Sequence, residues 1–403
     1  MISPAQPSDD RVAWSVTLHD PPRPRPWLRH AHHSPFPPIS GLLARSLTGT
    51  PRFRRTRYLF SSAAQAQSFI ADLYGSATRT QTFAAEMYGS AAQAPDFAAD
   101  IYGAAVVRRI VDEPFDRPVI IVSPPRSGGT MLFDALAAHP EVYALPGESE
   151  AVIEGVPALH PAARGYVSHA LTAADAVAAG QVVRWGFHAD LPERGLKLVE
   201  KTPENCLRLP FLLAVLPGAY VVFLRRDPKE TVASMVATWR DPRFVNIPEL
   251  PGWSRGAWHL LLPPGWRDLD GADLATVAAH QWSAAVEAVL DARSLVPAER
   301  WIEVDYADLL RRPGRVLAAL YERLGLSART VPIDFPLSAT TITPPVSGKW
   351  RRTAGFRPDA LDAHESTVRR LAAERFGDRG APPAEGESMK SAISGDRPDE
   401  ERS

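Results

Sequence analysis

A short apolar run, a glycine-containing loop and a helical pattern follow one another over residues 118–136, and this order constrains the fold more than any other feature. Residues 118–122 read PVIIV, a β-branched pattern typical of a buried parallel strand. Residues 123–130 then read SPPRSGGT. The helical pattern that follows consists of Met131, Leu132, Ala135 and Leu136. The sequence therefore predicts a strand that leads through a loop into a helix N-terminus, an arrangement that favours anions.

The residues of this loop suit a phosphate or a phosphosulfate. Gly128 and Gly129 let the backbone approach an anion closely, and successive N–H groups can form a nest around it. Arg126 offers a planar fork of donors, and the hydroxyls of Ser127 and Thr130 offer further ones. The structural alternative is a tight strand–helix turn without a ligand.

The loop is not a Walker A motif. That motif, G-x-x-x-x-G-K-[ST], needs a lysine directly before the last hydroxyl, and Gly129 stands there instead. The sequence therefore gives little support to an ordinary P-loop kinase, although a nucleotide-dependent kinase stays an alternative function.

Strand and helix patterns alternate along residues 113–378. Strand candidates are residues 196–200, 219–224 and 301–305, and helical patterns end at residue 216 or cover 229–239 and 315–324. Such alternation predicts an α/β fold, a P-loop NTPase-like parallel sheet flanked by helices.

A second segment suited to anions follows the strand candidate 219–224. Residues 224–234 read LRRDPKETVAS, so that Arg226 comes at the carboxyl end of a strand, where ligands bind in open parallel sheets. Asp227 is a natural N-cap and Pro228 a natural first helical residue. The structural alternative for Arg226 is a salt bridge with Asp227 or Glu230.

These two segments resemble those of sulfotransferases that use 3′-phosphoadenosine-5′-phosphosulfate (PAPS). PRSGGTML at residues 125–132 resembles the 5′-phosphosulfate loop, in the arginine form of the bacterial and tyrosylprotein enzymes. LRRDPKETVAS resembles the 3′-phosphate segment, whose arginine and serine map to Arg226 and Ser234. The resemblance implies PAPS as co-substrate and transfer of its sulfonyl group to an acceptor hydroxyl of a sugar, phenol, lipid or peptide.

Three further segments resemble the same family more loosely. EKTPEN at residues 200–205 resembles its strand-end lysine segment and points to Lys201. VDYADL at residues 304–309, followed by LGL, resembles a region in which Tyr306 would pack near the nucleotide. SGKW at residues 347–350 resembles a late loop whose lysine, here Lys349, contacts the cofactor. The resemblance covers roughly residues 118–360.

Sulfonyl transfer needs a clamp for the transferred group, charge support for the leaving phosphate and a base for the acceptor hydroxyl. The resemblance implies Arg126 and the loop N–H groups as the clamp, with Arg126, Lys201 and Lys349 as the charge support. Glu148, in the segment after the first helix, is the expected base, and Glu150 is the alternative. Weaker candidates for the base are His139, which is expected to cap the helix, and His188. The alternative without a catalytic role is that Glu148 and Glu150 belong to a solvated acidic loop.

The tryptophans at positions 239, 253, 258 and 266 lie within 28 residues of one another. They are expected either to pack in the core or a lid, or to form an apolar platform for the acceptor.

The N-terminal part of the chain differs from the rest. Residues 1–60 contain ten prolines and nine arginines against three acids, which predicts a largely disordered arm. Residues 61–112 are expected to be helical, because a 14-residue repeat (SAAQAQSFIADLYG in its first copy) occupies 62–103. The repeat predicts a packing appendage or a contact between copies in a homo-oligomer. The polar residues 379–403 are expected to form a disordered tail.

Composition limits the partners. A formal net charge of -1 gives no general attraction to nucleic acid or to an anionic membrane. Cys206 is the only cysteine, which fits a reducing compartment such as the cytoplasm. No stretch approaches the ~18 apolar residues of a membrane helix, and no His, Cys or Asp cluster has metal-ligand spacing. The resemblance to sulfotransferases implies a small-molecule, glycan or lipid acceptor as the partner. A non-catalytic nucleotide-binding protein is the remaining alternative.

Overall fold

The protein is described here by a computed structural model. The residues that the structure describes are 12–19, 42–50, 53–62, 64–66, 68–69, 105–111, 113–145, 148–189, 191, 195–328 and 347–374.

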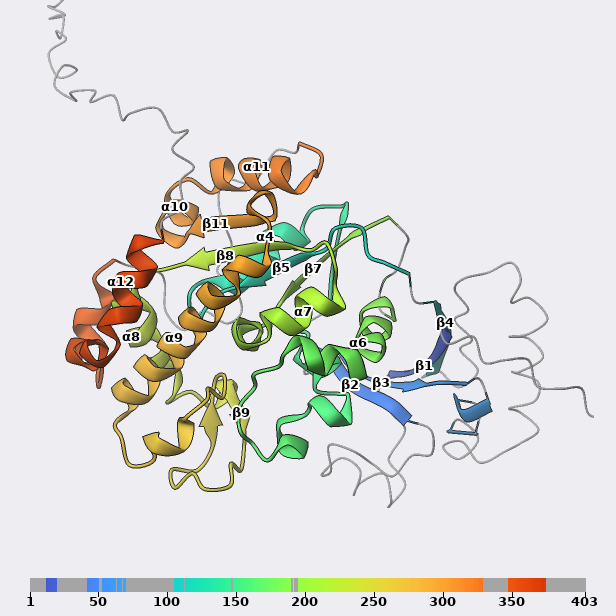
Figure 1. The fold of residues 1–403 in the computed structure, drawn as a ribbon, viewed down its shortest axis with the longest axis horizontal. Helices are drawn as coiled ribbons and strands as arrows, with labels where there is room; N and C mark the ends of the chain where they lie inside the picture. Colours follow the sequence, from blue (N-terminus) through green and yellow to red (C-terminus); the bar gives the residue numbers. More distant parts are fainter. Residues whose placement is uncertain are drawn as a thin grey trace, which may run out of the picture.

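A five-stranded parallel sheet forms the centre of the described structure (Figure 1). Its strands are β5 (Val119–Val122), β6 (Val142–Ala144), β7 (Lys197–Lys201), β8 (Tyr220–Arg225) and β11 (Trp301–Asp305), in the order β11-β8-β5-β7-β6. Each neighbouring pair is parallel. The predicted α/β fold with a parallel sheet is confirmed, because the strand candidates at 118–122, 196–200, 219–224 and 301–305 all form strands of it.

Helices cover both faces of this sheet. Val119 and Ile121 share one core with α4 (Gly129–Ala137) and α11 (Pro313–Leu324). Ile120 and Val122 share the other with α6 (Ala173–His188), α7 (Leu209–Val215), α8 (Pro228–Thr238) and α9 (Leu274–Asp291). Successive strand residues point to opposite faces, so a strand buried on both faces needs an unbroken apolar run.

The remaining elements surround these layers. The other helices are α5 (Glu150–Ile153), α10 (Tyr306–Arg311) and α12 (Glu365–Ala373), and β9 (Val245–Ile247) pairs antiparallel with β10 (Trp258–His259). The short 3₁₀ helices are η1 (Pro157–Leu159), η2 (Pro161–Arg164), η3 (Pro203–Leu207), η4 (Pro242–Phe244), η5 (Trp266–Leu269), η6 (Ala292–Leu295), η7 (Ala298–Arg300), η8 (Lys349–Arg352) and η9 (Pro358–His364). No helix in the described ranges combines the length and the apolar composition needed to cross a bilayer.

Helix α8 begins as its sequence predicts. The side chain of Asp227 accepts a hydrogen bond from the N–H of Glu230 at 3.0 Å, and Pro228 occupies the first helical position. This cap fixes the direction in which the chain leaves β8, and with it the position of Arg226 at the strand end.

A second, antiparallel sheet lies beside α6 at one end of the molecule (Figure 1). Its strands are β1 (Val12–His19), β2 (Leu42–Thr50), β3 (Phe53–Phe60) and β4 (Ala105–Val111), in the order β2-β3-β1-β4. Ala13, Leu59 and Ile110 are buried in the same core as Ile120.

This sheet differs from the sequence prediction of a disordered arm over 1–60 and a helical segment over 61–112. The apolar residues of β1 do alternate, but β1 is paired by distant segments: Val12 lies opposite Val111 of β4. Pairing between remote segments leaves no local signal, and the surrounding prolines and arginines obscured the alternation.

Most of the 14-residue repeat and the whole 379–403 tail lie outside the described residues. In the first copy, Phe69 is buried, with its ring centroid 4.5 Å from that of Tyr58 and 5.3 Å from that of Phe60. The described part of the first copy therefore packs against β3 through Phe69, whereas the roles proposed for the repeat stay predictions.

The four clustered tryptophans form part of the core. Trp258 is fully buried, and its ring centroid lies 5.1 Å from Trp239, 4.8 Å from Trp253 and 5.7 Å from Trp266. Aromatic contacts of this kind stabilise the packing of α8 against the β9–β10 region. Of the two interpretations of these tryptophans, the structure supports core packing.

Candidate active site

A cavity of about 1090 Å³ opens where β5, β7 and β8 end. It occupies the position in which open parallel sheets bind ligands, outside the carboxyl ends of the strands. Eleven candidate residues named from the sequence line it: Arg126, Gly128, Gly129, Thr130, Glu148, Glu150, Lys201, Arg226, Ser234, Tyr306 and Lys349. The cavity therefore brings together segments that are separated by more than 200 residues along the chain.

The backbone of the loop after β5 has a conformation that Gly128 makes possible. Gly128 has φ +98°, and a Cβ placed there would overlap the ring of Tyr306. Arg126 also has a left-handed φ, of 69°. Glycine is the only residue that adopts both the angle and the close approach without strain. The loop thus keeps its shape because Tyr306 packs directly on its backbone.

Replacing Gly128 by alanine should disrupt this loop. We expect a loss of about 2 to 5 kcal/mol in unfolding free energy, from left-handed strain and from overlap with Tyr306. Urea denaturation measures it. The control is Gly314→Ala in α11, where an added Cβ meets nothing within 4 Å; that change should stabilise the protein by up to ~1 kcal/mol. Equal effects of the two changes would contradict the argument.

Gly129 leaves room for a lysine that comes from another strand. A Cβ at Gly129 would lie 2.6 Å from Ser123 Oγ and 3.1 Å from Lys201 Cε. Lys201, at the end of β7, donates from Nζ to Thr130 Oγ1 at 3.0 Å. A cation therefore reaches the anion loop although the loop has no lysine of its own.

The same lysine holds the predicted base. Lys201 Nζ donates to Glu148 Oε1, so a buried ammonium pairs with a carboxylate whose side chain is 43% exposed. Glu148 faces the cavity. The pairing gives Glu148 a fixed position beside Thr130 at the end of the anion loop.

Arg226 connects the two segments suited to anions. Its Nη1 donates to the carbonyl oxygen of Arg126 at 2.8 Å, and its guanidinium carbon lies 4.6 Å from the ring centroid of Tyr306. The salt bridge with Glu230 that the sequence allowed is present, at 3.8 Å. These contacts restrict the guanidinium to one direction at the edge of the cavity.

Glu230 also joins the late loop to helix α8. It accepts a hydrogen bond from the N–H of Gly348 at 2.6 Å, directly before Lys349. Lys229 Nζ lies 5.1 Å from the ring centroid of Trp350, the next residue along. Both contacts position Lys349 and Trp350 at the cavity, where both are lining residues.

Positive charge is crowded on this side of the cavity. Burial lowers the pKa of Arg126 to about 10, and repulsion from Arg226 and Arg243 contributes to the shift. Burial likewise lowers the pKa of Lys349, again with repulsion from Arg226 and Arg126. Like charges held together in a partly buried site are stabilised by a bound anion. This side of the cavity therefore has the electrostatics of a site for a polyanion.

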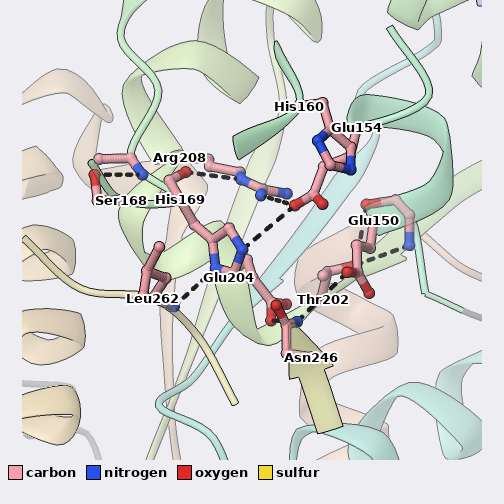
Figure 2. Close-up of polar contacts among 12 residues, drawn as sticks. Glu150, Glu154, His160, Ser168, His169, Thr202, Glu204, Arg208, Asn246 and Leu262 are labelled. Atoms are coloured by element: carbon pink, nitrogen blue, oxygen red, sulfur yellow. Dashed lines mark hydrogen bonds and ion pairs between the residues drawn. The ribbon is translucent and has the colours of Figure 1, made fainter. Parts of the chain in front are cut away.

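The other side of the cavity is acidic (Figure 2). Asn246 Nδ2, from β9, donates to Glu204 Oε1 at 3.0 Å and lies 3.4 Å from Glu150 Oε1. Burial raises the pKa of Glu204 to about 7, with repulsion from Glu148 and Glu154 adding to the shift. Burial, with repulsion from Glu154, Glu204 and Glu148, also raises the pKa of Glu150.

A fully buried network supports the acidic side from behind (Figure 2). Arg208 donates to Glu154 and, at 3.0 Å, to the carbonyl oxygen of His169. The ring of His169 lies 3.8 Å from Glu154, and its Nδ1 accepts the N–H of Leu262 at 2.8 Å. Burial lowers the pKa of His169 to about 3, so this histidine is neutral at pH 7. None of these residues lines the cavity, and the network is structural.

The raised pKa of Glu204 predicts a pH-dependent stability. Between its ordinary pKa of 4.5 and about 7, the folded protein keeps a proton that the unfolded chain releases, so stability falls as the pH rises through this window. The shift corresponds to at most about 3 kcal/mol. Glu204→Gln should therefore be more stable than the parent above pH 7 and equal to it near pH 4.5. Urea denaturation across this range measures it, and an unchanged pH profile would contradict the assignment.

Three residues named from the sequence do not line the cavity. Ser127 is buried, and its N–H donates to the carbonyl oxygen of Pro124 at 3.2 Å, which closes a turn inside the loop. His139 follows α4, but its Nε2 lies 3.0 Å from the carbonyl oxygen of Ser327, beyond the end of α11, rather than beside a carbonyl of α4 as expected for a cap. His188 lies on the far end of α6, 2.6 Å from the carbonyl oxygen of Glu113. Neither histidine is placed to act as a base in the cavity.

Several lining residues had not been identified from the sequence. Among them are Arg240, Arg243, Phe244, Asn246 and Glu204. The guanidinium carbon of Arg126 lies 4.7 Å from the ring centroid of Phe244. Glu204 lies in the EKTPEN segment and could have been considered, whereas Asn246 sits in a β-strand of three residues with no recognisable motif.

A model of the sulfotransferase family matches residues 118–330. Among solved structures, the sulfotransferase STF1 of Mycobacterium tuberculosis is 18% identical, covering 64% of this chain and 77% of that one, with a TM-score of 0.42. A sulfotransferase of Alicyclobacillus acidocaldarius is 17% identical, covering 65% and 96%, with a TM-score of 0.39.

A mouse sulfotransferase complexed with PAP is 13% identical, covering 64% of this chain and 87% of that one, with a TM-score of 0.37. No curated protein sequence matches the chain. The family match begins at β5 and includes the anion loop, Lys201, Arg226 and Tyr306, and it spans more than half of the sequence. The chain belongs to the sulfotransferase family.

Proposed function

We propose that the protein transfers the sulfonyl group of PAPS to an acceptor hydroxyl. The observation that carries this proposal is the hydrogen bond of 2.8 Å between Arg226 Nη1 and the carbonyl oxygen of Arg126. It joins the two segments that suit the 3′-phosphate and the 5′-phosphosulfate into one wall of the cavity. Lys201 and Lys349 add positive charge to the same wall.

The donor set fits PAPS, which carries a phosphate at the 3′ position and a phosphosulfate at the 5′ position of its ribose. The 5′-phosphosulfate would lie on Arg126, on the backbone of Gly128 and Gly129, and on Thr130, at the N-terminus of α4. The 3′-phosphate would contact Arg226 and Ser234. Tyr306 and Lys349 would border the nucleotide between them. Ser127 would support the loop from within, because its N–H is used in the turn.

PAPS would supply the sulfonyl group, and side chains of this chain would assist the transfer. Glu148 would accept the proton of the acceptor hydroxyl as that oxygen bonds to sulfur. Lys201, which contacts both Glu148 and Thr130, would hold the base in place and offset the negative charge that the leaving phosphate gains. Arg126 would fix the sulfonyl oxygens through its planar donors.

Calorimetric titration with adenosine 3′,5′-bisphosphate (PAP), the product of PAPS after transfer, tests the proposal. We expect micromolar binding of PAP and none of ATP–Mg²⁺. ATP–Mg²⁺ binding without PAP binding would overturn the proposal in favour of a kinase. PAP binding with no transfer to any hydroxyl compound would support a non-catalytic nucleotide-binding protein.

A further inference from the structure

The cavity has two sides of opposite charge. Its basic side contains Arg126, Arg226 and Lys349, which the proposed function assigns to PAPS. Its acidic side contains Glu150 and Glu204, which have no role in binding a polyanion. An acceptor has to enter the same cavity and reach Glu148, so the acidic side is the part left for it.

One carboxyl oxygen of Glu204 receives no hydrogen bond from the described residues. The residue is 3% exposed and lines the cavity. Its Oε1 accepts a hydrogen bond from Asn246 at 3.0 Å, whereas its Oε2 has no hydrogen-bond partner among the described residues. A buried carboxylate oxygen without a donor is energetically costly, so a ligand that supplies the donor would gain a favourable contact.

Neither acidic residue is directly paired with a cation of the described chain, although attraction from Arg208 favours the ionised form of both. In the ranges that the structure describes, no ion pair joins Glu150 or Glu204 to a basic side chain, because Arg208 pairs with Glu154 and Lys201 pairs with Glu148. Asn246 contributes only a neutral amide that lies between the two carboxylates. Among the described residues, no directly paired cation stabilises the ionised forms of these two carboxyl groups, and the pKa of each is raised. A cationic ligand would supply that stabilisation in this partly dry site.

Glu150 and Glu204 lie close to Glu148, the proposed base. Glu204 lies in η3, three residues after Lys201, and Lys201 contacts Glu148. Glu150 follows Glu148 by two residues. All three glutamates line the same cavity, and repulsion from Glu148 acts on both Glu150 and Glu204, so a ligand group held by these two lies near Glu148.

We infer that the acceptor carries an ammonium group, which donates to Glu204 Oε2 and lies against Glu150 while an acceptor hydroxyl reaches Glu148. This rests on the proposed function. A primary ammonium has three donors and one positive charge, which match the free oxygen and the uncompensated charge. A neutral polyol offers donors without the charge. In the described residues, no group of three or more His, Cys, Asp or Glu side chains could hold a metal ion instead.

Matched pairs of hydroxyl compounds test the inference. The probes are tyramine and 4-ethylphenol, 3-amino-1-propanol and 1-butanol, and glucosamine and glucose, each titrated calorimetrically into the full chain saturated with PAP. At about pH 8 tyramine and 3-amino-1-propanol are largely protonated, and the glucosamine pair is titrated at about pH 7, because its amine is less basic. For at least one pair, the amine is expected to bind about 10- to 100-fold more tightly than its neutral partner.

Two variants test whether a preference for the amine over its neutral partner comes from the acidic side. Glu204→Gln keeps the shape and removes the charge, so the preference should fall at least about tenfold while the Kd for PAP stays unchanged. Glu299→Gln, an exposed glutamate away from the cavity, should leave both unchanged. Equal or absent binding across all three pairs, or a preference that survives Glu204→Gln, overturns the inference. Failure of PAP itself to bind overturns the proposed function, so the two failures are distinguishable.

Discussion

Replacing Glu148 by glutamine is expected to lower kcat by about 10²- to 10⁴-fold, the usual contribution of a general base. Glutamine has nearly the same shape but cannot take the proton of an acceptor hydroxyl. The Kd for PAP should stay the same or fall, because Lys201, which now pairs with Glu148, would be left free to contact the anion. Rates with a hydroxyl acceptor and calorimetry with PAP measure the two quantities.

The neighbouring glutamate provides the comparison that assigns the base. Glu150→Gln should raise the KM for the acceptor more than it lowers kcat, because Glu150 lies on the acidic side and its contact is with Asn246. The exposed Glu299→Gln serves as the control. A large fall in kcat for Glu150→Gln with normal turnover in Glu148→Gln would exchange the two roles.

Replacing Arg226 by alanine is expected to weaken PAP binding about 10- to 100-fold, as the loss of charge-assisted hydrogen bonds to a phosphate would. The effect has two sources. The proposed contact with the 3′-phosphate disappears, and so does the hydrogen bond to the carbonyl oxygen of Arg126 that supports the other anion loop. Calorimetric titration with PAP measures it.

Two further variants separate charge from structure at this position. Arg226→Lys keeps the charge but not the planar donor fork, so its affinity for PAP should lie between those of the parent and Arg226→Ala. Arg311→Ala removes an arginine that is 69% exposed and pairs with Asp308, and it should leave the affinity unchanged. Parent-like PAP binding by Arg226→Ala would remove Arg226 from the binding site.

The sequence alone determined the parallel sheet and the two segments suited to anions, because these features depend on short-range patterns. The run at 118–122 is apolar at every position, as a strand buried on both faces must be. Asp227 and Pro228 predict the start of α8, because an N-cap hydrogen bond and a proline at the first helical position act within one helical turn. Gly128 and Gly129 mark a close approach of the backbone, although the sequence did not reveal that Tyr306 is what approaches Gly128.

Only the tertiary structure decided which groups meet at the site. Lys201 reaches Thr130 and Glu148 because β7 lies directly beside β5 in the sheet, a neighbour relation that no local pattern encodes. Asn246 meets Glu204 on the acidic side of the cavity because β9 pairs with β10, whose Trp258 packs in the tryptophan core. The N-terminal sheet is the clearest case. Its strands are stabilised by partners far along the chain. Their own sequence, rich in proline and arginine, therefore resembles that of a disordered arm.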